Sequence, residues 1–143
     1  MVKVVYIDGV FDLFHRGHLE SLIKAKNIFN DPDNTYLIVG VVSDKDCESY
    51  KRTPIINELD RVEIVKNIKL VDQVIFPCPM FTTLQFVENN NIDLVVHGFP
   101  NQKDREDQYV YFAEVIKKDR FKEINYHSGI STTEIIKKIK NLI

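Results

Sequence analysis

Short apolar runs that alternate with helix-like segments are the feature that most constrains the fold of this chain. Strand-like runs lie at residues 2–7, 36–42, 73–76, 93–97 and 121–125. Helices are predicted between them at residues 17–29, 58–70, 83–90 and 106–118, with a last helix at residues 132–142. Five strands separated by helices predict an α/β domain with a parallel sheet, right-handed crossovers and helices on both faces. This is the doubly wound, Rossmann-like architecture.

Local signals place the helix starts and the connections. Asn57 is a suitable N-cap for the helix at residues 58–70, and Ser131 to Glu134 form a capping-box pattern before the last helix. Residues 31–34 are predicted to form a turn. Residues 43–57 are predicted to form a long polar connection rather than a tight turn. Because parallel strands present their C-terminal ends at one edge of the sheet, the loops that follow them are expected to form the ligand site.

Composition indicates a single soluble domain that spans residues 1–143. The chain is 44% hydrophobic and 28% charged, and its formal net charge of −2 gives no general attraction to nucleic acid or to an anionic membrane. No apolar run approaches the roughly 20 residues that span a bilayer, and no signal peptide or membrane-binding segment is recognised, so a cytoplasmic location is predicted. Cys47 and Cys78 lack metal-ligand spacing and are expected to be reduced thiols.

The segment from Gly9 to His18 follows the first strand run and opens the first helix. His15 and His18 are separated by Arg16 and Gly17, and imidazoles can donate hydrogen bonds to anionic oxygens. A helix N-terminus adds aligned N–H groups, and glycine allows a close approach of the backbone to a ligand. The segment therefore predicts a turn that binds phosphate.

Two signatures together resemble those of the nucleotidyltransferase superfamily, and more narrowly those of the cytidylyltransferases of phospholipid synthesis. The first is the His15-Arg16-Gly17-His18 turn, an H-x-G-H motif, and the second is the Gly129-Ile130-Ser131-Thr132-Thr133 segment. Between them, Tyr50-Lys51 and residues 57–61 and 71–74 follow the order and approximate spacing of that family. The resemblance extends from residue 4 to residue 139.

This resemblance implies a reaction in which CTP and a phosphorylated small alcohol give a CDP-alcohol and pyrophosphate. A phosphate oxygen of the alcohol would attack the α-phosphorus of CTP in line, without a covalent enzyme intermediate. Catalysis would then depend on positioning and on stabilising charge at the phosphoryl oxygens. Mg²⁺ is expected to bind with CTP, held mainly by phosphate oxygens and water. The resemblance also implies a homodimer.

The resemblance further implies roles for individual residues. His15 and His18 would donate to the triphosphate and stabilise the pentacoordinate phosphorus, and Lys51 would reach the phosphates of both reactants. Phe11 is expected to pack beneath the turn, and Asp12 to orient it. The implied nucleotide-binding residues are Gly9, Val10, Phe11, Gly17, Arg61, His97, Gly98, Gly129, Ile130, Ser131, Thr132 and Thr133. The implied second-substrate residues are Asp8, Lys51, Met80 and Tyr109, and no protein residue is implied as a metal ligand.

Three departures from the family pattern keep alternatives open. Tyr126 replaces an arginine that helps to hold the nucleotide, which leaves a catalytically degenerate binding domain as one hypothesis. His97-Gly98 resembles the ethanolamine-type enzymes, and Met80 stands where choline-type enzymes place a tryptophan, which this chain lacks. These features favour phosphoethanolamine over phosphocholine, since aromatic faces bind quaternary ammonium groups best. Glycerol 3-phosphate as second substrate, and an ATP-dependent reaction, are further alternatives.

Overall fold

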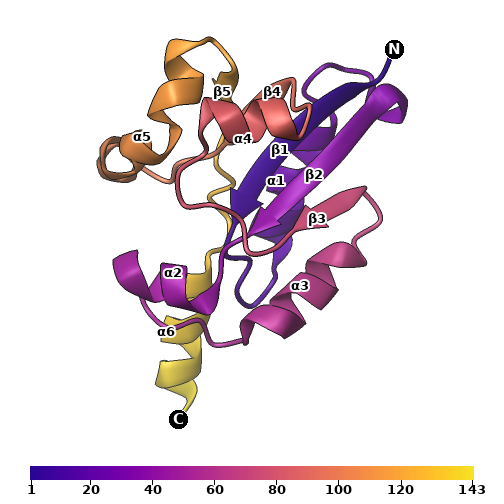
Figure 1. Ribbon diagram of the computed structural model, residues 1–143. Coiled ribbons are helices and arrows are strands. Elements are labelled where there is room, and N and C mark those ends of the chain that lie inside the picture. The colour runs from indigo at the N-terminus through magenta and orange to yellow at the C-terminus, as the bar shows by residue number, and fades with distance from the viewer.

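A five-stranded parallel sheet forms the centre of the computed structural model, which describes residues 1–143 (Figure 1). Its strands are β1 (Lys3–Gly9), β2 (Thr35–Val41), β3 (Gln73–Ile75), β4 (Leu94–His97) and β5 (Phe121–Glu123). They lie in the order β3-β2-β1-β4-β5, and all four strand pairings are parallel. The strand order reverses between β1 and β4, which is where ligands bind in open α/β sheets. The predicted doubly wound α/β fold is confirmed.

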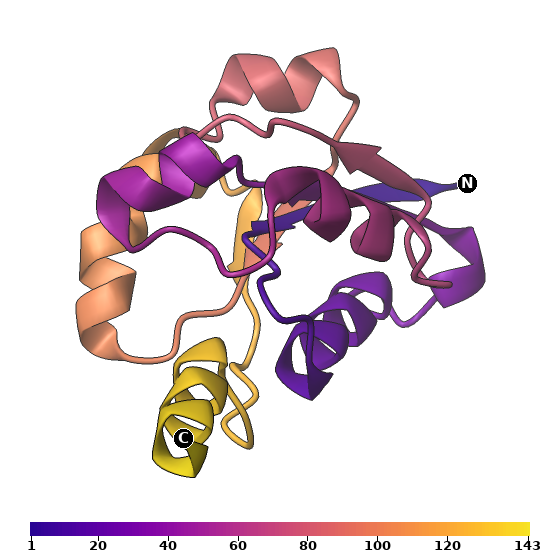
Figure 2. The same cartoon turned by 90° about the horizontal axis from the view of Figure 1, so that it is seen from below.

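Helices cover both faces of the sheet. The helices of the chain are α1 (Arg16–Lys26), α2 (Asp44–Tyr50), α3 (Glu58–Lys66), α4 (Leu84–Asn89), α5 (Gln102–Lys117) and α6 (Thr132–Leu142), with a 3-10 turn at Pro32–Asn34. Figure 2 shows α1 and α4 on opposite sides of the sheet. None of these helices combines the length and the apolar character needed to cross a membrane.

The two faces of the sheet are packed by alternate residues of the same strands. In β1, Val5 and Ile7 join a core cluster with Leu22 of α1 and Val65 of α3. Tyr6, between them in sequence, joins the opposite cluster, which contains residues of α4 and α5. A central parallel strand is buried on both faces, so it appears in the sequence as a continuous apolar run.

Helices α2, α3 and α5 differ most from the sequence-based prediction. Residues 44–50, expected to lie in a polar connection, form α2, and Ser43 caps it by accepting a hydrogen bond from the Asp46 amide at 3.1 Å. Cys47 is the one buried residue of this helix, so it lacks the apolar stripe that predicts a helix. Helix α3 ends at Lys66 rather than near residue 70. Helix α5 begins at Gln102 rather than near residue 106, with Asn101 as its N-cap.

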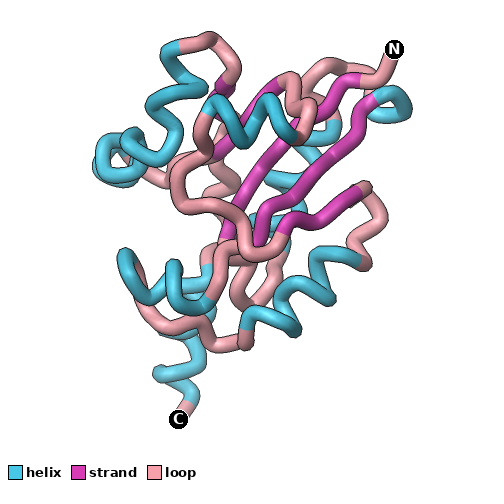
Figure 3. Tube along the Cα trace, viewed as in Figure 1, coloured by secondary structure: helices cyan, strands magenta, loops and turns pink.

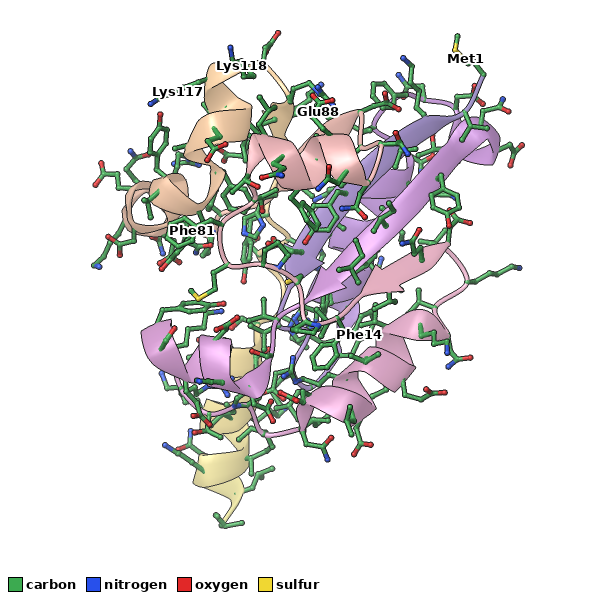
Figure 4. The ribbon with its side chains drawn as sticks, viewed as in Figure 1. Met1, Phe14, Phe81, Glu88, Lys117 and Lys118 are labelled. Atoms are coloured by element: carbon green, nitrogen blue, oxygen red, sulfur yellow. The ribbon has the colours of Figure 1, made fainter.

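The loops that follow the strands gather at one end of the sheet. Figure 3 shows α2 and α6 beyond the C-terminal ends of the central strands, with loop segments between. In Figure 4, Phe14 of the loop after β1 lies against α3, and Phe81 of the loop before α4 lies beside α5. The Thr82 amide fixes this second loop by donating to the Tyr111 carbonyl of α5 at 2.8 Å. The long-range contacts therefore bring the loops after β1, β2, β3 and β4 to a common edge.

Candidate active site

The turn after β1 holds two imidazoles in a fixed orientation at the start of α1. His15 is the N-cap of α1, and its Nδ1 accepts a hydrogen bond from the Gly17 amide at 3.0 Å. His18 Nδ1 accepts from the His15 amide at 3.2 Å, and the two rings stack with their centroids 3.9 Å apart. A neutral imidazole that accepts at Nδ1 carries its proton on Nε2. Each histidine can therefore donate a hydrogen bond through its Nε2–H group.

The environment of both histidines favours the neutral form. Burial, together with the charges of His15 and Lys51, lowers the pKa of His18 to about 3. Burial, and then the neighbouring His127, lowers the pKa of His15 as well. At neutral pH the turn thus presents two neutral N–H donors rather than two imidazolium ions.

The second signature lies directly against the first. Thr132 Oγ1 donates to the Asp12 carbonyl at 2.9 Å and lies 3.4 Å from His15 Nε2. The Ile130 carbonyl approaches Gly17 so closely that a Cβ added there would lie 3.1 Å from it. Any larger residue at position 17 would also collide with the His15 ring, at 2.8 Å. The tertiary structure thus joins two signatures more than 100 residues apart into one cluster.

The N-terminus of α6 completes this cluster. Ser131 is the N-cap and accepts from the Glu134 amide at 3.1 Å, as the capping pattern predicted. The first amide groups of a helix lack intrahelical partners and carry a partial positive charge. Thr132 and Thr133 therefore present main-chain N–H groups near His15, an arrangement suited to binding an anion.

Lys51 lies at the exposed C-cap of α2, within electrostatic reach of His18. Its ammonium is 5.9 Å from the centroid of the Tyr50 ring. Lys51 therefore lies between the histidine cluster and a neighbouring pocket, which Tyr50 lines.

Arg61 has a position that the sequence did not predict. Its side chain is 0% exposed and donates to the carbonyls of Val10, Val42 and Ile56 at 2.6, 2.9 and 3.0 Å. The remaining terminal nitrogen bonds Asp44 at 2.6 Å. With its donors directed at protein acceptors, Arg61 ties the histidine turn to α2 and α3, and we no longer assign it a phosphate contact.

The other glycines and the apolar residues of the turn support its shape. Phe11 adopts a positive φ of 56° and packs, buried, against Phe14 and His18, as predicted. A Cβ at Gly9 would lie 3.0 Å from the Phe11 ring. A Cβ at Gly129 would lie 3.0 Å from the His127 ring, so the second signature folds closely on itself.

A pocket beside the histidine cluster opens between β1, β4, α2 and α5. It is lined by Asp8, Gly9, Val42, Tyr50, Cys78, Pro79, Met80, His97, Gln108, Tyr111 and Phe112. Asp8 Oδ1 lies 3.2 Å from His97 Nδ1, although the ring nitrogen is not aligned for a hydrogen bond. The pocket therefore combines one carboxylate with apolar and aromatic surface, which suits a small cation.

Of the four predicted second-substrate residues, Asp8 and Met80 line this pocket, whereas Lys51 and Tyr109 do not. Gly9 and His97, predicted at the nucleotide, also line it. Tyr109 is 45% exposed and is absent from the lining, so its predicted contact is not supported by the geometry. Helix α5 instead presents Gln108, Tyr111 and Phe112, which share one face because they are three and four positions apart. The sequence interpretation missed this spacing.

Gly98 and Tyr126 lie together after β4 and β5. A Cβ at Gly98 would lie 3.3 Å from the Ile124 carbonyl and 3.8 Å from the Tyr126 Cα. Tyr126 is half exposed, and burial together with the charge of Asp104 raises the pKa of its phenol. Tyr126, which departs from the family pattern, thus lies beside Gly98, one of the implied nucleotide-binding residues.

Comparison with known proteins defines the class. The family model described as cytidylyltransferase-like matches residues 6–138, and the chain belongs to this family. Choline-phosphate cytidylyltransferase A of Homo sapiens is 39% identical over 137 residues, which are 94% of this chain and 36% of that protein. Ethanolamine-phosphate cytidylyltransferase of Mus musculus is 34% identical over 134 residues, 92% of this chain and 31% of that protein. The chain thus spans about a third of each of these two relatives.

A solved structure supports the fold. The lipopolysaccharide core biosynthesis protein from Thermoplasma volcanium GSS1 superposes with a TM-score of 0.67 at 22% identity. The match covers 89% of this chain and 98% of that one.

Proposed function

We propose that this chain is a cytidylyltransferase that transfers CMP from CTP to a phosphorylated amino alcohol, phosphoethanolamine or phosphocholine, and releases pyrophosphate. The single observation that carries this proposal is the contact between the two signatures, in which Thr132 meets both His15 and the Asp12 carbonyl. Family membership and the named relatives support the same reaction class.

In this mechanism the Nε2–H groups of His15 and His18 donate to the phosphoryl oxygens of CTP. They carry no charge in the free enzyme and are held by main-chain amides, so little reorganisation is needed when charge develops at the α-phosphorus. The first turn of α6 would bind the leaving β- and γ-phosphates through its N–H groups. Lys51, between the histidine cluster and the Asp8 pocket, would pair with the attacking phosphate and orient it in line.

The nucleotide is proposed to carry Mg²⁺ into the site. The chain has no group of three or more His, Cys, Asp or Glu side chains arranged to hold a metal ion, and the Asp12 carboxylate is fully engaged by protein donors. Phosphate oxygens and water would therefore supply the ligands, and the ion would neutralise charge on the triphosphate.

The pocket lined by Asp8 is proposed to bind the ammonium end of the second substrate. Asp8 supplies the opposite charge, and Tyr50 and Tyr111, whose centroids are 6.3 Å apart, supply aromatic surface. A primary ammonium would use Asp8 and the Gln108 amide as acceptors, whereas a quaternary ammonium would use the rings. The sequence-based preference for phosphoethanolamine stays a prediction.

The experiment is pyrophosphate release from CTP with phosphoethanolamine, phosphocholine or glycerol 3-phosphate, each at matched concentration. We expect kcat/KM for one of the amine substrates to exceed that for glycerol 3-phosphate by at least tenfold, since only the amines can pair with Asp8. ATP in place of CTP is the nucleotide control. A preference for glycerol 3-phosphate would refute the assignment of the Asp8 pocket.

The replacement of arginine by Tyr126 motivates one competing function, a non-catalytic nucleotide-binding domain. It predicts CTP binding without pyrophosphate release from any of the three substrates. The hydrogen bonds that fix the orientation of His15 and His18 favour the enzyme.

A homodimer is proposed from the family resemblance. Strand β3 is an edge strand that pairs only with β2, so its outer side is available to another chain. Light scattering of the purified protein would test this, and a monomeric mass at micromolar concentration would refute it.

A further inference from the structure

Asp12 holds two distant segments of the chain at once. Its carboxylate is 3% exposed and accepts from the Ile55 and Ile56 amides at 2.8 and 2.9 Å. The Arg52 guanidinium donates to the same carboxylate at 3.0 Å. The main-chain carbonyl of Asp12 accepts from Thr132 at the start of α6. One residue of the histidine turn is therefore bonded to both other segments of the phosphate site.

The carboxylate is suited to this role because all of its partners favour the charged form. Burial acts to raise the pKa of Asp12, but the two amides and Arg52 outweigh it and hold the pKa below its usual value. Hydrogen bonds to an ionised acceptor are about twice as strong as neutral ones. We call the contacts among Asp12, Arg52, Ile55 and Ile56 the Asp12 latch.

The latch restrains the segment that carries Lys51. This residue ends α2, and the chain from Arg52 to Ile56 has no helix or strand before α3 begins at Glu58. The latch attaches that segment to the histidine turn within a few residues of Lys51. Lys51 itself ends a seven-residue helix, and the segment after it is also contacted by the Cys47 thiol at the Arg52 carbonyl, 3.2 Å, and by Arg61 at the Ile56 carbonyl, 3.0 Å. Of these contacts, the latch is the one that joins the segment directly to an acidic side chain of the histidine turn.

We infer that Asp12 is a positioning residue that couples Lys51 to the histidine turn and to α6, with Arg52 as the charged partner that strengthens this latch. The inference rests on the proposed function for its kinetic readout. Asp12 itself touches no substrate in this scheme. It acts by fixing where Lys51 and Thr132 stand relative to His15, and small displacements of a positioned group can lower a rate by as much as about 100-fold.

Asp12→Asn tests the latch directly. The amide keeps one oxygen acceptor but places an NH₂ group against the second main-chain N–H, so one of the two amide contacts is lost. We expect kcat to fall about 30-fold, with KM for CTP changed less than threefold, since the CTP-binding histidines stay in place. Arg52→Gln should lower kcat about fivefold, and Arg52→Lys should restore it to within about twofold because the charge is kept.

A double-mutant cycle separates positioning from general destabilisation. If Asp12 acts through Lys51, Asp12→Asn should lower kcat less than about threefold in a Lys51→Ala background. An equal loss in both backgrounds would overturn the inference. Asp93→Asn is the matched control, since Asp93 also accepts from a main-chain amide, that of Val4 at 2.7 Å, but at the start of β4, away from the site. It should leave kcat unchanged.

Amide hydrogen exchange gives a readout that does not need activity. The Ile55 and Ile56 amides should exchange at least tenfold faster in Asp12→Asn than in the unsubstituted chain or in Asp93→Asn, while the amides of β1 stay protected. Unchanged exchange at both positions would overturn the latch, whatever the activity. A chain that releases no pyrophosphate but shows this faster exchange would refute the proposed function and keep the latch.

Discussion

The histidine cluster and the Asp8 pocket are neighbours, yet they are built in opposite ways. In the cluster, the ring nitrogens that face the protein are held by main-chain amides only two or three residues away. In the pocket, residues from β1, α2, β4 and α5 meet residues of the loops after β2 and β3, and His97 Nδ1 is buried without a hydrogen bond. The cluster is therefore held by contacts within the turn itself, whereas the pocket depends on contacts between segments far apart in the chain. We infer that contacts within the turn position the groups that transfer CMP. Packing between distant segments then determines which second substrate the pocket binds.

The largest expected effect is loss of the His18 donor. In His18→Asn, the side-chain oxygen can replace Nδ1 as acceptor for the His15 amide, but the Nε2–H donor is removed. We expect kcat for pyrophosphate release to fall about 10²- to 10³-fold, as for loss of a preorganised donor elsewhere. His18→Gln is the paired control, since its amide can reach the Nε2 position, and it should retain more activity. Equal turnover in His18→Asn and the unsubstituted chain would contradict the assigned role.

The same residue should make stability depend on pH. Because the folded pKa of His18 is lowered to about 3, the unfolded chain binds more protons below its ordinary pKa near 6.5. The free energy of unfolding should therefore be highest above pH 6.5. It should fall as the pH decreases, by about 2 kcal/mol between pH 6.5 and 5. Urea denaturation at several pH values measures this. His18→Asn, which does not titrate, should show a shallower slope, and an unchanged slope would show that another group is responsible.

In the pocket, Asp8→Asn should change substrate affinity rather than turnover. Loss of the opposite charge should raise KM for the amine substrate about tenfold, with KM for CTP changed less than twofold. Steady-state kinetics with each substrate varied in turn measures both constants. Asp33→Asn, in the exposed 3-10 turn, is the control. A rise confined to KM for CTP would show that the Asp8 pocket binds the nucleotide rather than the second substrate.

The smallest effect concerns the border between the two regions. Tyr126→Arg should lower KM for CTP about threefold, because a guanidinium can form paired bonds with phosphate or carbonyl oxygens that a phenol cannot. Tyr126→Lys, which adds the charge without the paired geometry, should give a smaller change. If neither variant alters CTP binding, Tyr126 lies outside the nucleotide site.

Residues near one another in the sequence were predicted well. The spacing of His15, Gly17 and His18 after a strand run was sufficient to predict the turn, and Ser131 was correctly predicted as a cap. Helix α2 was missed because a short, exposed helix with one buried residue has no apolar period. Tyr50 was not assigned to the pocket because nothing in the sequence indicates that α2 and α5 face each other.

Arg61 is the clearest case in which the sequence-based prediction of a role differs from the contacts in the structure. An arginine between two phosphate-binding motifs suggests a phosphate ligand, yet its donors are directed at carbonyls of three separate loops and at Asp44. The sequence by itself determined the alternating α/β order, the doubly wound sheet and the histidine turn, because these depend on short-range periodicity and on neighbouring residues. Tertiary structure alone decided which side chains are buried, that Asp12 joins Lys51 to α6, and which residues line the Asp8 pocket, because these depend on contacts between segments far apart in the chain.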